Sequence, residues 1–208
     1  MLKFCKIVLT FFTTIILLVA CRSHPVPTPA QLAIQTHNYG LMRNQTIYVD
    51  SAFTERELTI IKSAADEWER ATNGTVHFTL FWFAKLPDHE IHTYVPYNTM
   101  IRLNSNNQHV FETDLRIRDN TAGFLQTTSG SYYIGIVADR ITVESLLKSV
   151  VIHEMGHALG LDHDDSSPAI MNRAAYYREP CLSYSDLNQF CNRYRCNVAQ
   201  MSFCVYNN

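Results

Sequence analysis

The segment HEMGHALGLDH, residues 153–163, sets three histidines, one glutamate and a glycine at fixed offsets. Residues four apart on a helix project from the same face, so His153 and His157 can act together only if this segment is helical. Gly160 readily takes a positive φ, which ends a helix and turns the chain. The turn lets His163 swing back toward the other two histidines. The motif therefore predicts a helix, a stop and a reversal.

This spacing suits a metal site. Two imidazoles one turn apart can both reach one zinc ion at about 2.0–2.1 Å, and His163 supplies a third ligand. Three protein ligands leave a position for water, whose pKa zinc lowers to about 7. Glu154 can accept the proton of that water and pass it to a leaving amine. The alternative is a core helix whose histidines bond to the backbone; the extended pattern favours zinc, because each added position is independently required.

Hydrophobic periodicity predicts the helices of the remaining chain. Three helices are expected, over 54–71, 142–159 and 185–193. Thr54 and Glu57 fit a capping box at the start of the first. Ser185 is the expected N-cap of the third.

Short runs rich in β-branched and aromatic residues predict the strands. Five are expected, over 46–50, 75–83, 100–103, 122–127 and 132–137. The order of strands and helices indicates an α+β domain, with a mixed sheet flanked by helices.

Composition limits the class of protein. The chain has 208 residues, of which 47% are hydrophobic and 17% charged, which indicates one globular domain. The formal net charge is -2 and no run of Lys and Arg occurs, so we expect no nucleic-acid partner.

The first twenty residues differ in kind from the rest. Lys3 and Lys6 precede an almost wholly apolar run over 7–20, which is too short for a comfortable membrane span. A positive start followed by such a run is typical of an export signal. Residues 1–20 are therefore predicted to be a signal peptide.

The apolar run ends in LVAC at residues 18–21, which resembles the lipobox of bacterial lipoproteins. That resemblance implies cleavage before Cys21 and lipidation of its thiol, so we expect an exported protein anchored to a bacterial membrane. The alternative is an ordinary secretory signal and a secreted protein. Residues 21–44, with prolines at 25, 27 and 29, are predicted to be a flexible tether, and 45–208 the folded domain.

Four further cysteines gather near the C-terminus: Cys181, Cys191, Cys196 and Cys204. In an oxidising compartment such an even cluster predicts two disulfides, with three possible pairings. A structural zinc held by four thiolates is the rival interpretation. It is disfavoured because the chain has no Cys-x-x-Cys pair.

The motif resembles that of the metzincin zinc endopeptidases. The resemblance implies that His153, His157 and His163 bind one catalytic Zn²⁺ and that Glu154 is the general base. It also implies a Met-turn beneath the metal, for which Met171 is the candidate.

Within the metzincins the chain looks like a matrixin over about 46–194. This implies a metzincin-like catalytic domain with a mixed, twisted sheet. By analogy, the segment with Gly123, Phe124 and Leu125 is a sheet edge that pairs with extended substrate. The segment 172–177, which includes Tyr176, is expected to wall a substrate pocket.

Three features depart from the matrixin pattern. No cysteine-switch propeptide is found, because Cys21 lies in the lipobox. No clear set of Ca²⁺ or structural zinc ligands is present; Asp88, His89 and His92 could bind a metal, but a solvated loop is favoured. The four-cysteine tail is not standard and is expected to staple a small domain.

The expected function is that of a lipid-anchored, monomeric zinc endopeptidase acting on extracytoplasmic proteins or peptides. Two alternatives stay open: a zinc amidase acting on cell-wall peptides, and a non-catalytic surface binding protein that keeps zinc. The second alternative predicts damage to the base or a ligand, and none is seen.

Overall fold

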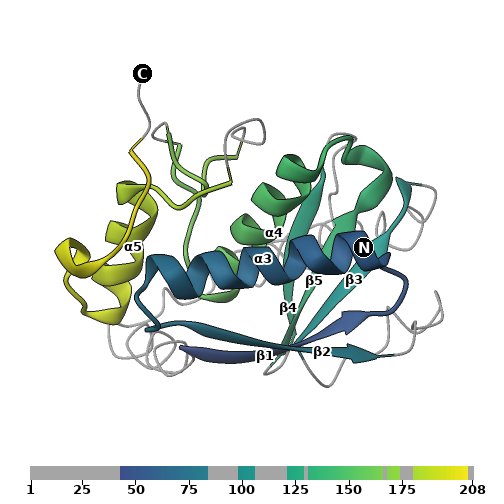
Figure 1. The fold of residues 1–208 in the computed structure, drawn as a ribbon, viewed down its shortest axis with the longest axis horizontal. Coiled ribbons are helices and arrows are strands. Elements are labelled where there is room, and N and C mark those ends of the chain that lie inside the picture. Colours follow the sequence, from purple (N-terminus) through teal and green to yellow (C-terminus); the bar gives the residue numbers. More distant parts are fainter. Residues whose placement is uncertain are drawn as a thin grey trace, which may run out of the picture. The chain divides into compact units, whose positions relative to one another are not determined.

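The computed structural model describes residues 43–83, 98–105, 121–128, 131–165, 168–173 and 180–205 (Figure 1). All of them belong to the unit Tyr39–Asn208. The predictions for Cys21 and most of the tether, for the segment with Asp88, His89 and His92, and for Tyr176 lie outside these residues. Within the described ranges, no helix is both long and apolar enough to cross a membrane.

A five-stranded mixed sheet forms one layer (Figure 1). Its strands are β1 (Asn44–Asp50), β2 (His77–Phe83), β3 (Thr99–Leu103), β4 (Gly123–Thr128) and β5 (Ser131–Val137). Their spatial order is β2-β1-β3-β5-β4, with every pair parallel except β4 and β5. The antiparallel β4 is thus an edge strand of this sheet.

In the described part of the chain, three α-helices accompany the sheet: α3 (Glu55–Ala71), α4 (Glu144–Ala158) and α5 (Tyr184–Tyr194). The same residues include two short 3₁₀ helices, η2 and η3, at Ala138–Arg140 and Val198–Gln200. The α+β class and the mixed sheet predicted from the sequence are therefore confirmed. So is the capping box of α3, in which Thr54 and Glu57 each bond the other's backbone N–H.

The predicted start of the third helix was wrong. Ser183, not Ser185, is the N-cap of α5, and its hydroxyl accepts from the Asp186 N–H at 3.2 Å. Asp186 in turn accepts from the Ser183 N–H at 2.8 Å, which completes a capping box. Ser185 lies in the first turn of α5, and its hydroxyl donates instead to Asp164. Both serines fit an N-cap by type; only the partner of each side chain separates them.

The helices α3 and α4 pack against each other, and α4 also contacts β4 and β5. The fully buried indole of Trp68 on α3 donates to Ile152 O on α4 at 3.0 Å. Of the fifteen residues of α4, eleven are buried, among them His153 and Glu154. The helix that carries the motif is thus held in place on nearly all sides.

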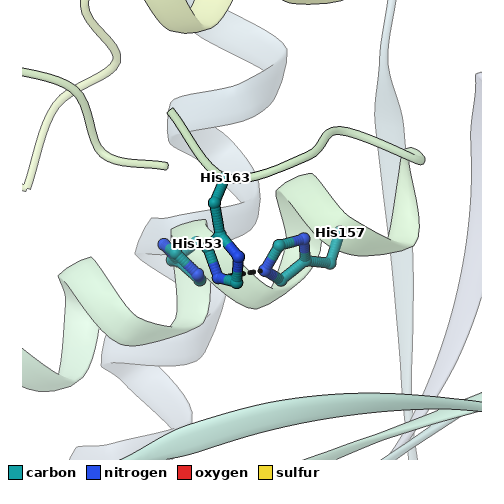
Figure 2. Close-up of side chains that lie close together, drawn as sticks. All are labelled: His153, His157 and His163. Atoms are coloured by element: carbon teal, nitrogen blue, oxygen red, sulfur yellow. Dashed lines mark hydrogen bonds between the residues drawn. The ribbon is translucent and has the colours of Figure 1, made fainter. Parts of the chain in front are cut away.

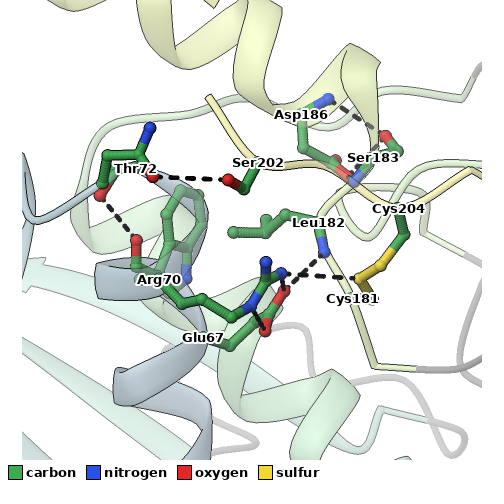
Figure 3. A network of polar contacts seen from close by, with 11 residues as sticks. Glu67, Arg70, Thr72, Cys181, Leu182, Ser183, Asp186, Ser202 and Cys204 are labelled. Atoms are coloured by element: carbon green, nitrogen blue, oxygen red, sulfur yellow. Dashed lines mark hydrogen bonds and ion pairs between the residues drawn. A yellow bond between two sulfur atoms is a disulfide. The ribbon is translucent and has the colours of Figure 1, made fainter. Parts of the chain in front are cut away.

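Two disulfides close the C-terminal tail, Cys181–Cys204 and Cys191–Cys196, which selects one of the three possible pairings. Cys204 N also donates to Leu182 O at 2.9 Å. The buried carboxylate of Glu67 on α3 accepts from Leu182 N at 3.3 Å and pairs with Arg70 (Figure 3). The segment that leads into α5 is therefore joined both to the tail and to α3.

Candidate metal centre

Two of the motif's histidines lie one turn apart on α4, and the third follows on the loop after it (Figure 2). Gly160 has φ of +79°, so the predicted left-handed turn is present. The N–H of Leu161 donates to Gly156 O at 2.9 Å, which closes the turn. As Figure 2 shows, His163 then reaches back toward His157.

Hydrogen bonds fix two of the rings. His153 Nδ1 lies 2.8 Å from Ile170 O, and His157 Nδ1 lies 2.8 Å from Leu161 O. A carbonyl oxygen can only accept, so each Nδ1 carries the proton and each Nε2 keeps its lone pair. This outer hydrogen bond is the usual partner of a metal-binding histidine.

The residues fit a zinc ion. One ring nitrogen from each of His153, His157 and His163 lies within 4.8 Å of the other two. The Nε2 atoms of His157 and His163 are 3.2 Å apart. Without a metal one of these nitrogens can donate to the other, and the same separation suits two imidazole ligands of one tetrahedral zinc ion. Among the described residues, these three form the only group of His, Cys, Asp and Glu able to surround an ion; nitrogen donors in this number suit zinc.

Protonation favours the same conclusion. Burial, strengthened by the neighbouring His157 and His163, lowers the pKa of His153 to about 3. Burial is also the largest cause that lowers the pKa values of His157 and His163. All three rings are therefore neutral at pH 7, which is the form that binds a metal.

Glu154 lies beside this cluster and is almost fully buried, at 2% exposure. Its Oε2 has no hydrogen-bond partner among the described residues. Burial raises the pKa of Glu154 to about 8. A Cβ added at Gly123 would lie 2.9 Å from Glu154 Oε1 and 2.5 Å from Val150 Cγ1. Only a glycine therefore lets the backbone of β4 approach the carboxylate this closely.

Met171 is fully buried against the face of α4 that carries the motif. A Cβ added at Gly156 would collide with Met171 Sδ. The carboxylate of Asp186 accepts from the backbone N–H groups of Ile170 at 2.9 Å and Met171 at 3.0 Å. Gly156 was not singled out from the sequence, and Asp186 only as part of a pattern. The nearest sequence signal is the small residue between the two histidines of α4.

A pocket of about 470 Å³ opens beside the histidines, between β4 and the turn that follows α4. Three of its lining residues were predicted to bind substrate: Gly123, Phe124 and Leu125. The rings of Phe124 and Tyr133 meet edge to face, with their centroids 5.8 Å apart, so Phe124 packs on the sheet. A larger hollow of about 620 Å³ lies at the N-terminal ends of α3 and α4, but no motif histidine lines it.

Fold and site together define a metzincin-like protein, with a mixed sheet, an antiparallel edge strand and a histidine triad on and after one helix. The matrixin family model matches residues 39–194. The chain belongs to the matrixin family. Matrixins are zinc-dependent metallopeptidases.

One curated relative is the archaemetzincin of Natronomonas pharaonis, 37% identical over 71 residues, or 34% of this chain. The match spans only 35% of that relative's length. Among solved structures, the match to myroilysin covers 83% of this chain and 69% of the myroilysin chain, with 14% sequence identity and a TM-score of 0.33.

Proposed function

We propose that the chain is an endopeptidase that cleaves internal bonds of extracytoplasmic proteins, with zinc on His153, His157 and His163 and with Glu154 as general base. One observation carries the proposal. The Glu154 carboxylate is buried beside the three converging imidazoles, and its Oε2 has no partner in the described part of the chain. A buried carboxyl oxygen without a partner costs stability, so its presence calls for an explanation, and a catalytic role supplies one.

Zinc, when bound, supplies a Lewis acid that polarises the substrate carbonyl and acidifies water. Glu154 takes one proton from the attacking water, whose oxygen bonds to the carbonyl carbon. As the C–N bond breaks, Glu154 gives that proton to the leaving nitrogen. Burial raises the pKa of Glu154 to about 8 in the metal-free protein. A bound cation nearby would lower that pKa, which would leave the carboxylate free to take the proton of water.

The edge strand β4 is the proposed binding site for the substrate backbone. Among the described strands it pairs only with β5, so its outer groups face the pocket side. Gly123 and Leu125 line that pocket together with His153 and Glu154. An extended peptide added to this edge would bring its scissile bond to the metal.

The cellular location is proposed from the sequence. The LVAC segment at 18–21 supports export and lipidation of Cys21, and secretion follows if Cys21 is not lipidated. The two disulfides support an oxidising compartment, because such bonds are rare in the cytosol. That the protein acts as a monomer stays a prediction.

The test is cleavage of a diverse peptide library by the purified chain, beside Glu154→Ala at matched zinc content. We expect the wild type to cut internal bonds and the variant to keep zinc without cutting. Cutting restricted to cell-wall stem peptides would indicate an amidase instead. If both proteins bind zinc and neither cuts any peptide, the chain is a binding protein.

A further inference from the structure

Three side chains of α5 contact the loop that carries the third histidine. Arg193, Gln189 and Ser185 are spaced by four residues, so they form one stripe along the helix. They contact Gly160, Asp162 and Asp164 respectively, and His163 lies between the last two.

The central contact of the stripe binds the backbone of Asp162, directly before His163. The Asp162 N–H donates to Gln189 Oε1 at 2.8 Å, and Gln189 Nε2 donates to Asp162 O at 3.1 Å. The amide therefore binds both backbone groups of Asp162, as a neighbouring strand would. A change in the backbone orientation of Asp162 would therefore break both hydrogen bonds.

The two flanking contacts fix the ends of the loop. A Cβ added at Gly160 would lie 2.5–2.6 Å from three atoms of the Arg193 guanidinium, so the guanidinium lies directly against the glycine backbone. At the other end, Ser185 Oγ donates to Asp164 Oδ2.

The spacing of helix and loop explains why the contacts fall in register. Four residues of α-helix rise about 6 Å, a distance that two residues of chain can span because each reaches at most about 3.3–3.6 Å. Each step of four along α5 thus matches a step of two along the loop, in the opposite chain direction. The residues between the contacts serve the metal site: Leu161 O accepts from His157, and His163 joins the triad.

The disulfides hold the ends of this helix. Cys191–Cys196 joins the last turn of α5 to the residue after its C-cap, Arg195. Cys181 lies two residues before the N-cap Ser183 and is bonded to Cys204 (Figure 3). A disulfide therefore lies near each end of α5 and restrains the helix that carries the stripe.

We propose that the disulfide-stapled helix α5 positions the third metal ligand, and that Gln189 is the positioning residue that sets the orientation of His163. This inference rests on the proposed zinc site. It assigns the four-cysteine tail a role in metal binding, besides its contribution to folding stability.

The test uses the full chain with both disulfides formed, comparing Gln189→Ala with the wild type. Asn192→Ala is the matched control, because it removes the same primary amide from an exposed position on the same helix. The readouts are the Zn²⁺ dissociation constant by chelator competition, the visible absorption of bound Co²⁺, and the melting temperature of the metal-free protein.

We expect Gln189→Ala to weaken Zn²⁺ binding by about 10-fold, because removing a group that orients a metal ligand typically lowers metal affinity by about that factor. The Co²⁺ spectrum should change, while the metal-free melting temperature should match that of the Asn192→Ala control. Gln189→Glu keeps the acceptor for the Asp162 N–H and loses the donor to Asp162 O. Its Zn²⁺ affinity should therefore lie between those of the wild type and Gln189→Ala.

Wild-type affinity and an unchanged Co²⁺ spectrum in Gln189→Ala would overturn the inference and leave the proposed function intact. A wild type that binds neither metal would overturn both. If Gln189→Ala does not fold, Ser185→Ala takes its place with the same readouts. Ser185→Ala removes the contact with Asp164, at the N-terminal end of the stripe. An unchanged Zn²⁺ affinity in that variant likewise rejects the role of α5.

Discussion

At the scale of single residues, the site contains buried ionisable groups that lower the stability of the fold, and their position beside one another explains why they are there. Glu154 is a buried carboxyl without a hydrogen-bond partner for Oε2 among the described residues, and His153 is a buried imidazole with a strongly lowered pKa. Gly156 and Gly123 make room for Met171 and for Glu154, respectively. These residues give up stability or side-chain volume to place reactive groups close together.

The raised pKa of Glu154 makes a prediction for the metal-free protein. Its carboxyl binds a proton in the folded state up to about pH 8, against 4.5 as the reference value. The folded state thus binds more protons across this window, and the stability that Glu154 contributes below pH 4.5 is lost as the pH rises through 8. Glu154→Gln removes this loss, so its unfolding free energy relative to wild type should rise over the same window. Urea unfolding of both proteins from pH 4.5 to 8.5 checks this, and a constant difference would contradict it.

Gly156 makes a steric prediction. In Gly156→Ala the new methyl group meets Met171 Sδ and lies 3.3 Å from Trp68. Overpacking of this kind costs about 1–3 kcal/mol of unfolding free energy. Lys148→Ala, on the same helix, is the control and should lose far less. Denaturant unfolding measures both, and equal stability would show that Met171 can move away without cost.

At the scale of elements, α5 connects parts that are distant in the sequence. Its Asp186 binds the backbone N–H groups of Ile170 and Met171, and its Gln189 binds the backbone of Asp162, directly before His163. Burial raises the pKa of the Asp186 carboxyl, while four hydrogen bonds oppose that rise. The helix therefore contacts two segments that surround the metal site, although it contributes no ligand.

The two disulfides should differ in what they contribute. The bonded cysteines are separated by 23 residues in Cys181–Cys204 and by 5 in Cys191–Cys196. Loop-closure entropy predicts stabilisation of about 3.5 kcal/mol for the longer loop and about 2 kcal/mol for the shorter. Replacing each pair by serines and measuring denaturant unfolding checks the order. A larger loss on removing Cys191–Cys196 would show that local geometry at the end of α5 outweighs chain entropy.

At the scale of the whole molecule, one buried helix, α4, joins the sheet, α3 and the metal site. A ligand that binds only the folded state stabilises it, and a metal held by residues from α4 and the following loop should do so. At a free Zn²⁺ concentration about 1,000 times the dissociation constant, the gain is about 4 kcal/mol.

Metal removal is therefore expected to lower the melting temperature. For a domain of this size 4 kcal/mol corresponds to about 10 °C. Treatment with a chelator should lower the melting temperature by about that amount, and added Zn²⁺ should restore it. His163→Ala lacks one ligand and should respond much less to Zn²⁺. A wild type whose melting temperature ignores both treatments would show that the triad does not hold zinc.

The sequence by itself determined the local features: the capping box of Thr54, the positive φ of Gly160, the helix under the motif, and the set of residues able to bind zinc. Each depends on spacing along a short stretch of chain, where backbone geometry leaves few choices. Only the tertiary structure decided which cysteines pair, that Ser183 rather than Ser185 caps α5, and that Gly156, Asp186 and Gln189 surround the site. The Cys181–Cys204 pair and the contacts of Gly156, Asp186 and Gln189 join segments that are distant in the chain, which no local periodicity encodes. The choice between the two serines depends on their partners, Asp186 for Ser183 and Asp164 for Ser185.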